Sequence, residues 1–559
     1  MDTPDQADRH EAARRYRQEH VDAVLASGAR KKIVVGGPGT GKTFLFRKVL
    51  EGKVKTLTLT FVNALVEELS LELFGLSEVR TLHAFARQQL ERATRQGVRV
   101  FPKLSAVIRQ DALALRGADV DFDALFHDNA GHDDNIEFYK RRRVYYGYYG
   151  FSDMIYGAVR FFEQHPSKIP QYTQVVVDEF QDFNAQEVAL IELLASRSPV
   201  LLAGDDDQAL YETLKCASPQ HIRQRHADAA SGYQTFSLPY CSRSTRVIVE
   251  AANDIVHGAT RAGYLQARIE KRFRYFDDPE KDRESERYPA LMLGQVHPRQ
   301  IPWFIQKRIQ GIAKEVRRQF SVLVISPTRP QCGRIAQALR QNGFENVQYT
   351  EREESREPTL LEGLDLLLQD RDSNLGWRVT ARALLPGTEF EGLLRQTAKH
   401  DAPPRLCDIV PNALKKRVKP LLRVLRAARD GEPAGDDECV LKGLKELGVD
   451  AAGMAVQSLS EQVTPSEQRS VDAGVRKISI TVTTIPGSKG LAADYVFIAH
   501  FDDRYFIKAE NKSHVADQDI CNFLVALTRA RTEVFLISYA GREEPKFLGW
   551  IEKNRVRTA

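Results

Sequence analysis

The sequence is poor in cysteine and lacks long apolar runs. Its six cysteines are scattered, and no two of them form a C-x-x-C pair; they are Cys216, Cys241, Cys332, Cys407, Cys439 and Cys521. This spacing argues against a zinc site or a disulfide framework and fits a reducing compartment. No stretch reaches the roughly 18 apolar residues that a membrane-spanning helix needs. We therefore expect no membrane association and no cysteine-based metal centre.

A dominant charge and a secretory signal are also lacking. The first twenty residues, MDTPDQADRHEAARRYRQEH, are polar, so a cytoplasmic location is expected. The chain has 80 basic and 75 acidic residues and a net charge of +5, which permits a polyanionic partner without demanding one. Its 559 residues, 42% hydrophobic and 28% charged, are typical of a globular protein with about three or four domains.

Short apolar strands alternate with helical patterns at both ends of the chain, which predicts two parallel α/β sheets. The first set of candidate strands is 31–37, 54–61, 174–180, 199–205 and 233–238, and the second set is 289–296, 320–326, 478–485, 494–501 and 533–539. Segments at about 87–165 and 351–470 interrupt these sets with helical apolar spacing. Within the second interruption, DGEPAGDDE (430–438) predicts a loop.

The first candidate strand leads directly into GGPGTGKT, which satisfies G-x-x-x-x-G-K-[ST]. In this pattern a glycine-rich turn and the following helix N-terminus surround phosphate oxygens. Lys42 is expected to reach the β- and γ-phosphates of ATP, and the Thr43 hydroxyl to ligate Mg²⁺. The rest of the predicted phosphate cradle is Gly36, Gly37, Pro38, Gly39, Thr40 and Gly41. The alternative is a chance glycine turn.

Two later strands end in acidic and amide residues. VVVDEFQDFN places Asp178 and Glu179 at the carboxyl edge of a sheet, where open α/β sheets bind ligands. Asp178 is predicted to hold Mg²⁺ and Glu179 to orient or activate the attacking water; the alternative is a solvated acidic turn. LLAGDDDQALY (201–211) brings Gln208 to a similar edge, where an amide can report on the γ-phosphate.

In order along most of the chain, these motifs resemble those of a superfamily 1 DNA helicase of the UvrD/Rep/PcrA type. VVVDEFQD resembles motif II, GDDDQALY motif III, LPYCSRSTRVIVEAAN (238–253) a changed motif IV, TIPGSKGLAADYVFI (484–498) motif V, and FLVALTRARTEVFLIS (523–538) motif VI. The resemblance implies ATP hydrolysis between two RecA-like domains, with Arg243 and Arg529 as arginine fingers. It implies an ATP-dependent helicase or single-stranded-DNA translocase, with 3′-5′ polarity by analogy.

The resemblance also implies four domains. The first RecA-like motor domain would comprise 1–86 and 166–240, with a helical 1B-like insertion at 87–165. The second would comprise 241–350 and 471–559, with a reduced 2B-like insertion at 351–470. No nuclease domain is expected after motif VI.

Further site residues are assigned by the resemblance alone. Gln18 and Gly490 join the predicted ATP site, although Gln18 could instead be a solvated helix residue. The predicted DNA contacts are Phe61, Asn63, His83, Lys215, Thr484 and Lys489. For Phe61 the alternative is core packing at a strand end.

Three basic segments allow different interpretations. FYKRRRVYYGYYGF (138–151) suits phosphate neutralisation with base stacking, or a solvated charge run beside a core-facing aromatic stripe. RFRYFDDPEK (272–281) and LKKRVKPLLRVLRAARD (414–430) predict solvated helix faces.

The chain departs from the family pattern where the family contacts adenine. Cys241 and Ser242 stand in motif IV in place of the usual Asn-Tyr pair, so the stacking tyrosine is missing. Tyr240 or Tyr16 could substitute for it.

Positions that couple the family's motor to DNA differ as well. In motif V, Pro486 replaces the usual His and Ala492 the usual Glu, and Thr213-Leu214 offers no aromatic residue after motif III. These changes leave a second hypothesis open: a DNA- or nucleotide-sensing ATPase subunit that regulates a partner nuclease, for example in antiviral defence, without processive unwinding.

Overall fold

The computed structural model describes residues 4–61, 63–129, 133–210, 217–316, 318–349, 357–398, 402–430, 478–506, 517–542 and 545–559. The chain divides into two compact units. Unit one comprises Met1–Phe85, Phe161–Arg352 and Val475–Ala559, and unit two comprises Ala86–Arg160 and Glu353–Gly474.

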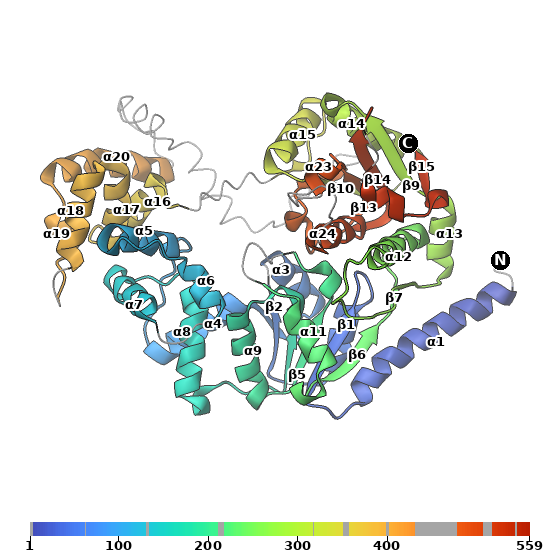
Figure 1. Cartoon of the computed structure of the whole chain (residues 1–559), viewed down its shortest axis with the longest axis horizontal. Coiled ribbons are helices and arrows are strands. Elements are labelled where there is room, and N and C mark those ends of the chain that lie inside the picture. Colours follow the sequence, from blue (N-terminus) through green and yellow to red (C-terminus); the bar gives the residue numbers. More distant parts are fainter. Residues whose placement is uncertain are drawn as a thin grey trace. The chain divides into compact units, whose positions relative to one another are not determined.

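A six-stranded parallel sheet forms the first half of unit one (Figure 1). Its spatial order is β3 (Glu78–Thr81), β2 (Thr56–Thr60), β4 (Gln174–Val177), β5 (Val200–Gly204), β1 (Lys31–Gly36) and β6 (Gln234–Leu238). Strands β2, β4 and β5 are buried throughout, as expected for parallel strands covered by helices on both faces. The helices of this half are α1 (Pro4–Ala26), α2 (Lys42–Leu50), α3 (Asn63–Glu72), α9 (Ala185–Arg197) and α11 (Gln220–Ala227).

A seven-stranded parallel sheet forms the other half of unit one. Its order is β11 (Val347–Gln348), β12 (Ser479–Thr483), β10 (Ser321–Ile325), β13 (Ala493–Ile498), β14 (Ala530–Tyr539), β9 (Leu291–Val296) and β15 (Val556–Thr558). One hydrophobic cluster joins this sheet to α12 (Arg246–Arg261) and α24 (Asp517–Leu527), and another joins it to α14 (Ile301–Glu315) and α15 (Arg329–Gln341). The remaining elements of this half are β7 (Tyr240–Cys241), β8 (Arg274–Tyr275), α13 (Pro279–Arg287) and α23 (Asp503–Phe506).

Unit two is built from helices. The two that enter it from unit one are α4 (Leu82–Thr94) and α8 (Phe151–Gln164). The others are α5 (Leu104–Arg116), α6 (Phe122–His127), α7 (Asp134–Tyr146), α16 (Leu360–Gln369), α17 (Asn374–Leu384), α18 (Gly387–Ala398), α19 (Leu406–Ile409) and α20 (Asn412–Asp430). A single hydrophobic core draws on both of its chain segments, with Leu104 and Ile136 from the first and Leu364 and Leu425 from the second.

A buried polar network also joins the two segments of unit two. Arg378 Nη2 lies 2.8 Å from Asp111 Oδ1, and Arg142 Nε donates to Asp111 Oδ2 at 2.9 Å. Tyr146 OH donates to the same oxygen, and Arg142 Nη1 donates to Thr397 Oγ1. Burial opposes the charge of Asp111, but the two arginines outweigh it and lower the pKa of that carboxyl. The charge of Asp111 is therefore fully compensated inside the core.

The structure confirms the predicted fold class of two parallel sheets flanked by helices, as expected for two RecA-like domains. Each of the ten candidate strands overlaps an observed strand. The prediction missed β3, β7, β8, β11 and β15, which have two to four residues each. The four-domain division stays a prediction. Of the predicted loop at 430–438, Asp430 is the last residue of α20, and 431–438 lie outside the described residues.

The prediction of a solvated helix face at 272–281 is wrong. Arg274–Tyr275 forms β8, which pairs with β7, and the side chains of Tyr275 and Phe276 are buried. The segment alternates charged and aromatic residues with a period of two, which is the period of a strand. The charge content alone therefore predicted a helix where the chain forms a short strand.

Among the residues that the structure describes, no helix is long and apolar enough to cross a membrane.

Candidate nucleotide site

The P-loop connects β1 to α2, and two of its own side chains donate hydrogen bonds to its carbonyl groups. Gly41 is the N-cap of α2 with φ 91°, and Gly39 has φ 70°, a region that favours glycine. Lys42 Nζ donates to Gly36 O at 3.0 Å, and Thr40 Oγ1 donates to Gly37 O at 2.9 Å. The loop and the first turn of α2 thus form a cradle suited to an anion.

Side chains from the second half of unit one pack directly on the P-loop. A Cβ on Gly37 would lie 2.8 Å from Phe273 Cδ2, and a Cβ on Gly39 would collide with Arg243 Cβ. The backbone N–H of Ser242 also donates to Gly39 O at 3.0 Å. Motif IV and the segment before α13 therefore touch the predicted phosphate site.

Two carboxylates follow β4 at the carboxyl edge of the first sheet. Asp178 is buried, and its backbone N–H donates to Leu59 O at 2.9 Å. Glu179 has a left-handed backbone (φ 54°), and its Oε2 accepts from Gln181 Nε2 at 2.5 Å. Burial, then the charge of Glu179, raises the pKa of Asp178 to about 7. Glu179 is half-buried; burial opposes its charge, but Lys489 and Lys42 outweigh that effect, lower its pKa to about 2 and keep it ionised.

The residues present fit a divalent cation. Asp178 Oδ1 is buried without a hydrogen-bond partner, although a carboxylate oxygen in that position needs one. Thr43, in the first turn of α2, supplies a hydroxyl at the P-loop. Carboxylate and hydroxyl oxygens are the ligands that Mg²⁺ prefers, so Asp178 and Thr43 could hold it beside a bound phosphate.

Motif III meets motif VI through a direct hydrogen bond. Gln208 ends the short helix η3 (Asp206–Gln208), and its Nε2 donates to Asp205 Oδ2 at 2.6 Å. Arg529 Nη2 donates to Gln208 Oε1 at 2.8 Å. Burial, then the charge of Arg243, lowers the pKa of Arg529 to about 10, which indicates that both predicted fingers lie in one region. An arginine of the second half of unit one thus reaches the nucleotide edge of the first sheet.

Lys489 lies in this cleft and not on an open surface. Its side chain is 3% exposed and forms an ion pair with Asp182. Lys489 Nζ also donates to Gln208 O at 3.0 Å and lies 3.7 Å from Glu179 Oε2. Its predicted DNA contact stays a prediction, while its observed partners are residues of motifs II and III.

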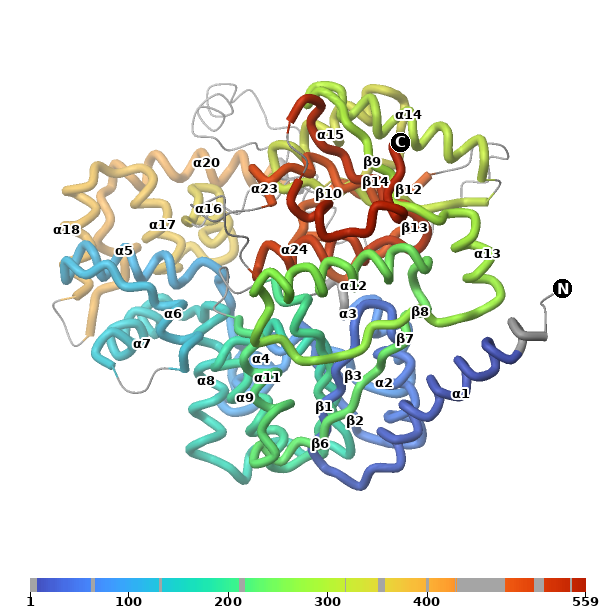
Figure 2. The backbone as a smooth tube through the Cα atoms, turned by 45° about the vertical axis from the view of Figure 1, so that its right-hand side comes forward, coloured from blue at the N-terminus to red at the C-terminus, as the bar shows by residue number. Residues whose placement is uncertain are grey.

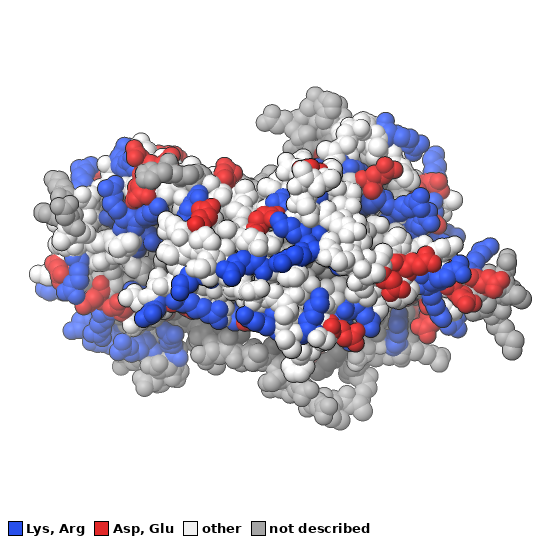
Figure 3. Space-filling view, turned by 90° about the horizontal axis from the view of Figure 1, so that it is seen from below, with Lys and Arg blue, Asp and Glu red and all other residues white. Residues whose placement is uncertain are grey.

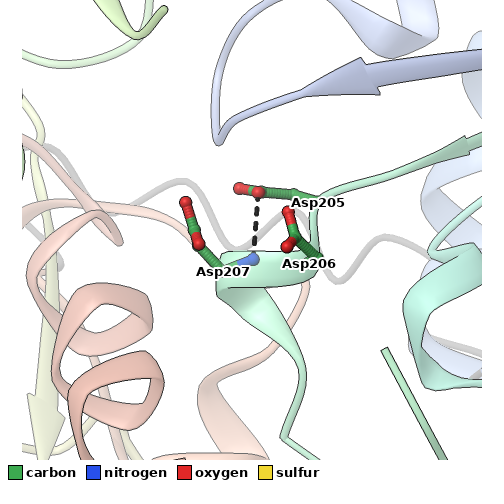
Figure 4. Close-up of side chains that lie close together, drawn as sticks. All are labelled: Asp205, Asp206 and Asp207. Atoms are coloured by element: carbon green, nitrogen blue, oxygen red, sulfur yellow. Dashed lines mark hydrogen bonds between the residues drawn. The ribbon is translucent and has the colours of Figure 1, made fainter. Parts of the chain in front are cut away.

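Three buried carboxylates lie beside Gln208 at the end of β5 (Figure 4). Oxygens of Asp205, Asp206 and Asp207 lie within 4.8 Å of one another, a spacing that could hold a metal ion. The ammonium of Lys271 lies 2.5 to 2.8 Å from an oxygen of each of the three. An amine therefore holds the position between these carboxylates.

A cavity of about 730 Å³ opens beside the P-loop, with Arg17, Ser242 and Phe276 at that end. Arg17 Nη2 lies 2.9 Å from the position of a Cβ on Gly41, and the Arg17 guanidinium carbon lies 4.9 Å from the Phe276 ring centroid. The sequence interpretation missed both residues. The signal for Phe276 was the alternation of arginine and aromatic residues at 272–276, but no sequence signal distinguishes Arg17 from its neighbours.

Other residues of the predicted ATP site are placed as follows. Gln18 is exposed on α1, and its Nε2 donates to Asp22 Oδ1 at 2.8 Å. Gly490 follows Lys489 with φ 82°, in the turn before β13. Of the two substitutes considered for the stacking tyrosine, Tyr16 is exposed, whereas Tyr240 lies edge-on to Phe276.

The remaining predicted DNA contacts are more dispersed. Phe61 is 6% exposed and packs edge-on against Phe183, so its ring is not open to a base in this conformation. His83 is half-buried on α4, and Thr484 Oγ1 accepts from Gly487 N. Asn63 begins α3, but its side chain lies outside the described residues, as does Lys215.

In the basic aromatic segment 138–151, the structure agrees with the second interpretation, a charge run beside a core-facing aromatic stripe. Tyr139 and Tyr146 are buried in the core of unit two. Arg142 belongs to the Asp111 network, while Arg141 is exposed. A core-facing aromatic stripe with a partly solvated charge run describes these residues.

Comparison with known families agrees with this geometry. Residues 20–214 match the profile of an AAA domain, and residues 416–541 match the UvrD-like helicase C-terminal domain. In these regions the chain is similar to UvrD-like helicases of superfamily 1. The two matched regions carry the P-loop with motif II and the second arginine finger respectively.

Individual UvrD-like relatives match shorter stretches. The chain is 39% identical over 87 residues, or 15% of its length, to DNA helicase II of Salmonella typhimurium. It is 33% identical over 111 residues, or 19% of this chain, to the ATP-dependent DNA helicase PcrA of Staphylococcus aureus. It is 32% identical over 125 residues, or 22% of this chain, to YjcD of Bacillus subtilis. These matches cover 12%, 15% and 16% of the relatives' own length.

Proposed function

We propose that this UvrD-like chain hydrolyses ATP between the two halves of unit one and uses the cycle to move along single-stranded DNA as a helicase or translocase. The observation that carries the proposal is the hydrogen bond from Arg529 Nη2 to Gln208 Oε1. It links the second half to the nucleotide edge of the first, so a change at the phosphates would be felt by both halves.

Each residue of the candidate site has a separate role in ATP hydrolysis. The P-loop N–H groups and Lys42 bind the phosphates, and Glu179, kept ionised, orients the attacking water and accepts its proton. Arg243 and Arg529 neutralise the negative charge that grows on the transferred phosphoryl group. Bound Mg²⁺, held by Thr43 and Asp178, would supply further charge neutralisation on the phosphate oxygens.

The nucleoside would occupy the cavity beside the P-loop. Arg17 offers a guanidinium for contact with a base, and the buried Phe276 ring supports that guanidinium from behind, next to the Ser242 position where the family has its tyrosine. Aromatic and guanidinium faces both favour stacking on a π-system.

DNA as the polymer is supported by the named activities of the relatives, which are DNA helicases. Lys and Arg side chains also gather in runs on the face shown in Figure 3, with fewer Asp and Glu between them. Such runs attract a polyanion through counterion release. The 3′-5′ polarity and the individual DNA contacts are part of the proposal.

The first test compares ATP turnover with and without single-stranded DNA, duplex DNA and RNA. Strand displacement is then measured on duplexes with a 3′ or a 5′ tail. Turnover stimulated by single-stranded DNA, with displacement from a 3′ tail only, supports the proposal. DNA-stimulated turnover without displacement would leave a translocase or a sensing ATPase. No stimulation by any polymer would contradict the DNA motor.

Two lysines of α2 provide a matched control. Lys42→Ala removes the phosphate-binding ammonium and should abolish turnover. Lys48→Ala, on the exposed face of the same helix with a surface ion pair to Glu51, should keep it. Unchanged turnover in Lys42→Ala would show that the nucleotide site is elsewhere.

A further inference from the structure

The segment Leu265–Phe273, here called the strap, lies between α12 and β8. Figure 2 shows it returning alongside α12 to reach β8. Lys271 of the strap extends into the Asp205–Asp207 triad, where its Nζ lies 2.7 Å from Asp205 Oδ1, 2.5 Å from Asp206 Oδ1 and 2.8 Å from Asp207 Oδ2. The Lys271 side chain is 6% exposed, so water hardly competes for these contacts.

Two further strap groups bind the same triad. Arg268 donates from Nε and Nη2 to the two oxygens of Asp207, at 3.0 and 2.6 Å. The backbone N–H of Ile269 donates to Asp206 Oδ2 at 2.8 Å. The forked contact of Arg268 is geometrically specific. The strap therefore holds motif III by several directional bonds.

The charges in this cluster are balanced. Arg223 on α11 pairs with Asp206, so three cations face three carboxylates. Burial opposes the charge on Lys271, but Asp205, Asp207 and Asp206 outweigh it and raise the pKa of its ammonium. Removing Lys271 would leave buried carboxylates that repel one another.

Lys271 also determines which oxygen of Asp205 accepts the hydrogen bond from Gln208. Asp205 Oδ1 is taken by Lys271 and by the backbone N–H of Asp207 at 3.2 Å. Oδ2 accepts from Gln208 Nε2. With its amide nitrogen held in this way, Gln208 turns its Oε1 toward Arg529 Nη2.

We propose that Lys271 is a positioning residue for ATP hydrolysis: by holding Asp205 Oδ1 it orients the Gln208 amide, and through Gln208 it places the Arg529 guanidinium. The inference rests on the proposed function, because it gives Lys271 a task in the same reaction. It assigns the carboxylate triad to an internal ammonium and not to a metal ion. A contact between the strap and motif III thus becomes a requirement for turnover.

The test is steady-state ATP turnover of the full chain with single-stranded DNA. Lys271→Met keeps the length of the side chain and removes its charge. We expect kcat to fall about tenfold or more while KM for ATP changes less than about twofold, because the P-loop is untouched. Lys314→Met, an exposed position on α14, is the matched control and should keep both constants.

A double-mutant cycle separates positioning from loss of stability. In a Gln208→Ala background, Lys271→Met should lower kcat by less than about twofold, because the group through which it acts is already gone. A multiplicative loss in that background, or an unchanged kcat in the single variant, would overturn the inference.

Asp205→Asn covers the case in which Lys271→Met does not fold: it keeps the size of the side chain and leaves three cations facing two carboxylates, so that no carboxylate lacks a counter-ion. It should lower kcat about as much and be equally non-additive with Gln208→Ala; independent effects would overturn the inference. Failure of the proposed function looks different, because the unaltered chain would then show no turnover that depends on Lys42.

Discussion

Gly39 and Gly52 have almost the same backbone conformation in different surroundings. Their φ angles are 70° and 73°, a region in which a side chain costs roughly 1–2 kcal/mol. A Cβ on Gly39 would collide with Arg243, whereas a Cβ on Gly52 would meet no atom within 4 Å. The pair therefore separates backbone strain from loss of the Arg243 contact.

We expect Gly52→Ala to lower the free energy of unfolding by about 1 kcal/mol and to keep ATP turnover. Gly39→Ala carries similar strain and also displaces Arg243, so its kcat should fall about tenfold or more. Urea unfolding and steady-state turnover of both variants give the comparison. Equal turnover in the two variants would contradict a catalytic role for the contact between Arg243 and the P-loop.

At the scale of elements, the longer apolar strands could be predicted from the sequence, whereas strands of only two or three residues could not. Strands such as 174–177 consist mostly of apolar residues, and burial on both faces of a parallel sheet favours that composition. Strand β8 has only two residues, Arg274 and Tyr275, so its identity depends on pairing with β7 far along the chain. Local patterns cannot encode a distant partner.

The candidate site likewise contains residues that the sequence could identify and residues that it could not. Lys42, Asp178, Glu179 and Gln208 belong to contiguous motifs, so the sequence could identify them. Lys271 belongs to no such motif, and its partners lie more than sixty positions earlier in the chain. Its charge suggests a solvated surface, and only the folded arrangement places it among buried carboxylates.

Phe276 provides a test of how β8 contributes to the nucleoside cavity. Phe276→Leu keeps an apolar side chain and removes the ring that faces Arg17. We expect KM for ATP to rise about three- to tenfold with kcat nearly unchanged, since an aromatic contact contributes about 0.5–1.5 kcal/mol. Inhibition by tripolyphosphate, which has no base, should stay the same.

Phe74→Ala serves as the control, because Phe74 is 89% exposed in unit one. Equal weakening of ATP and tripolyphosphate by Phe276→Leu would indicate damage to the P-loop and contradict a base contact.

At the scale of the whole molecule, unit two contains a carboxyl whose titration should be visible in stability. Burial raises the pKa of Asp153 to about 7, against the opposing effects of Arg143 and the hydrogen bond from Tyr139. The usual value is near 4. Because the folded state binds this proton more tightly than the unfolded state, unit two should gain stability as pH falls from about 7 to about 4.

Asp153→Asn should remove that gain, because an amide does not titrate. The measurement is urea unfolding at pH 8 and pH 5, followed by fluorescence of Trp377 in a Trp303→Phe/Trp550→Phe background. Trp377 is buried in unit two. Equal pH dependence with Asp and Asn at position 153 would contradict the assignment.

The shared core of unit two has a consequence for how such chains can be recombined and diversify. The described residues of 86–160 and of 357–430 bury their apolar side chains in one core, and Asp111 pairs with Arg378 across the boundary between these two segments. A chimera that replaced 86–160 with the segment of a relative would leave the buried Arg378 without Asp111, a defect of about 3–5 kcal/mol. The two segments should therefore be exchangeable only as a pair, and substitutions at 111 and 378 should covary among related sequences.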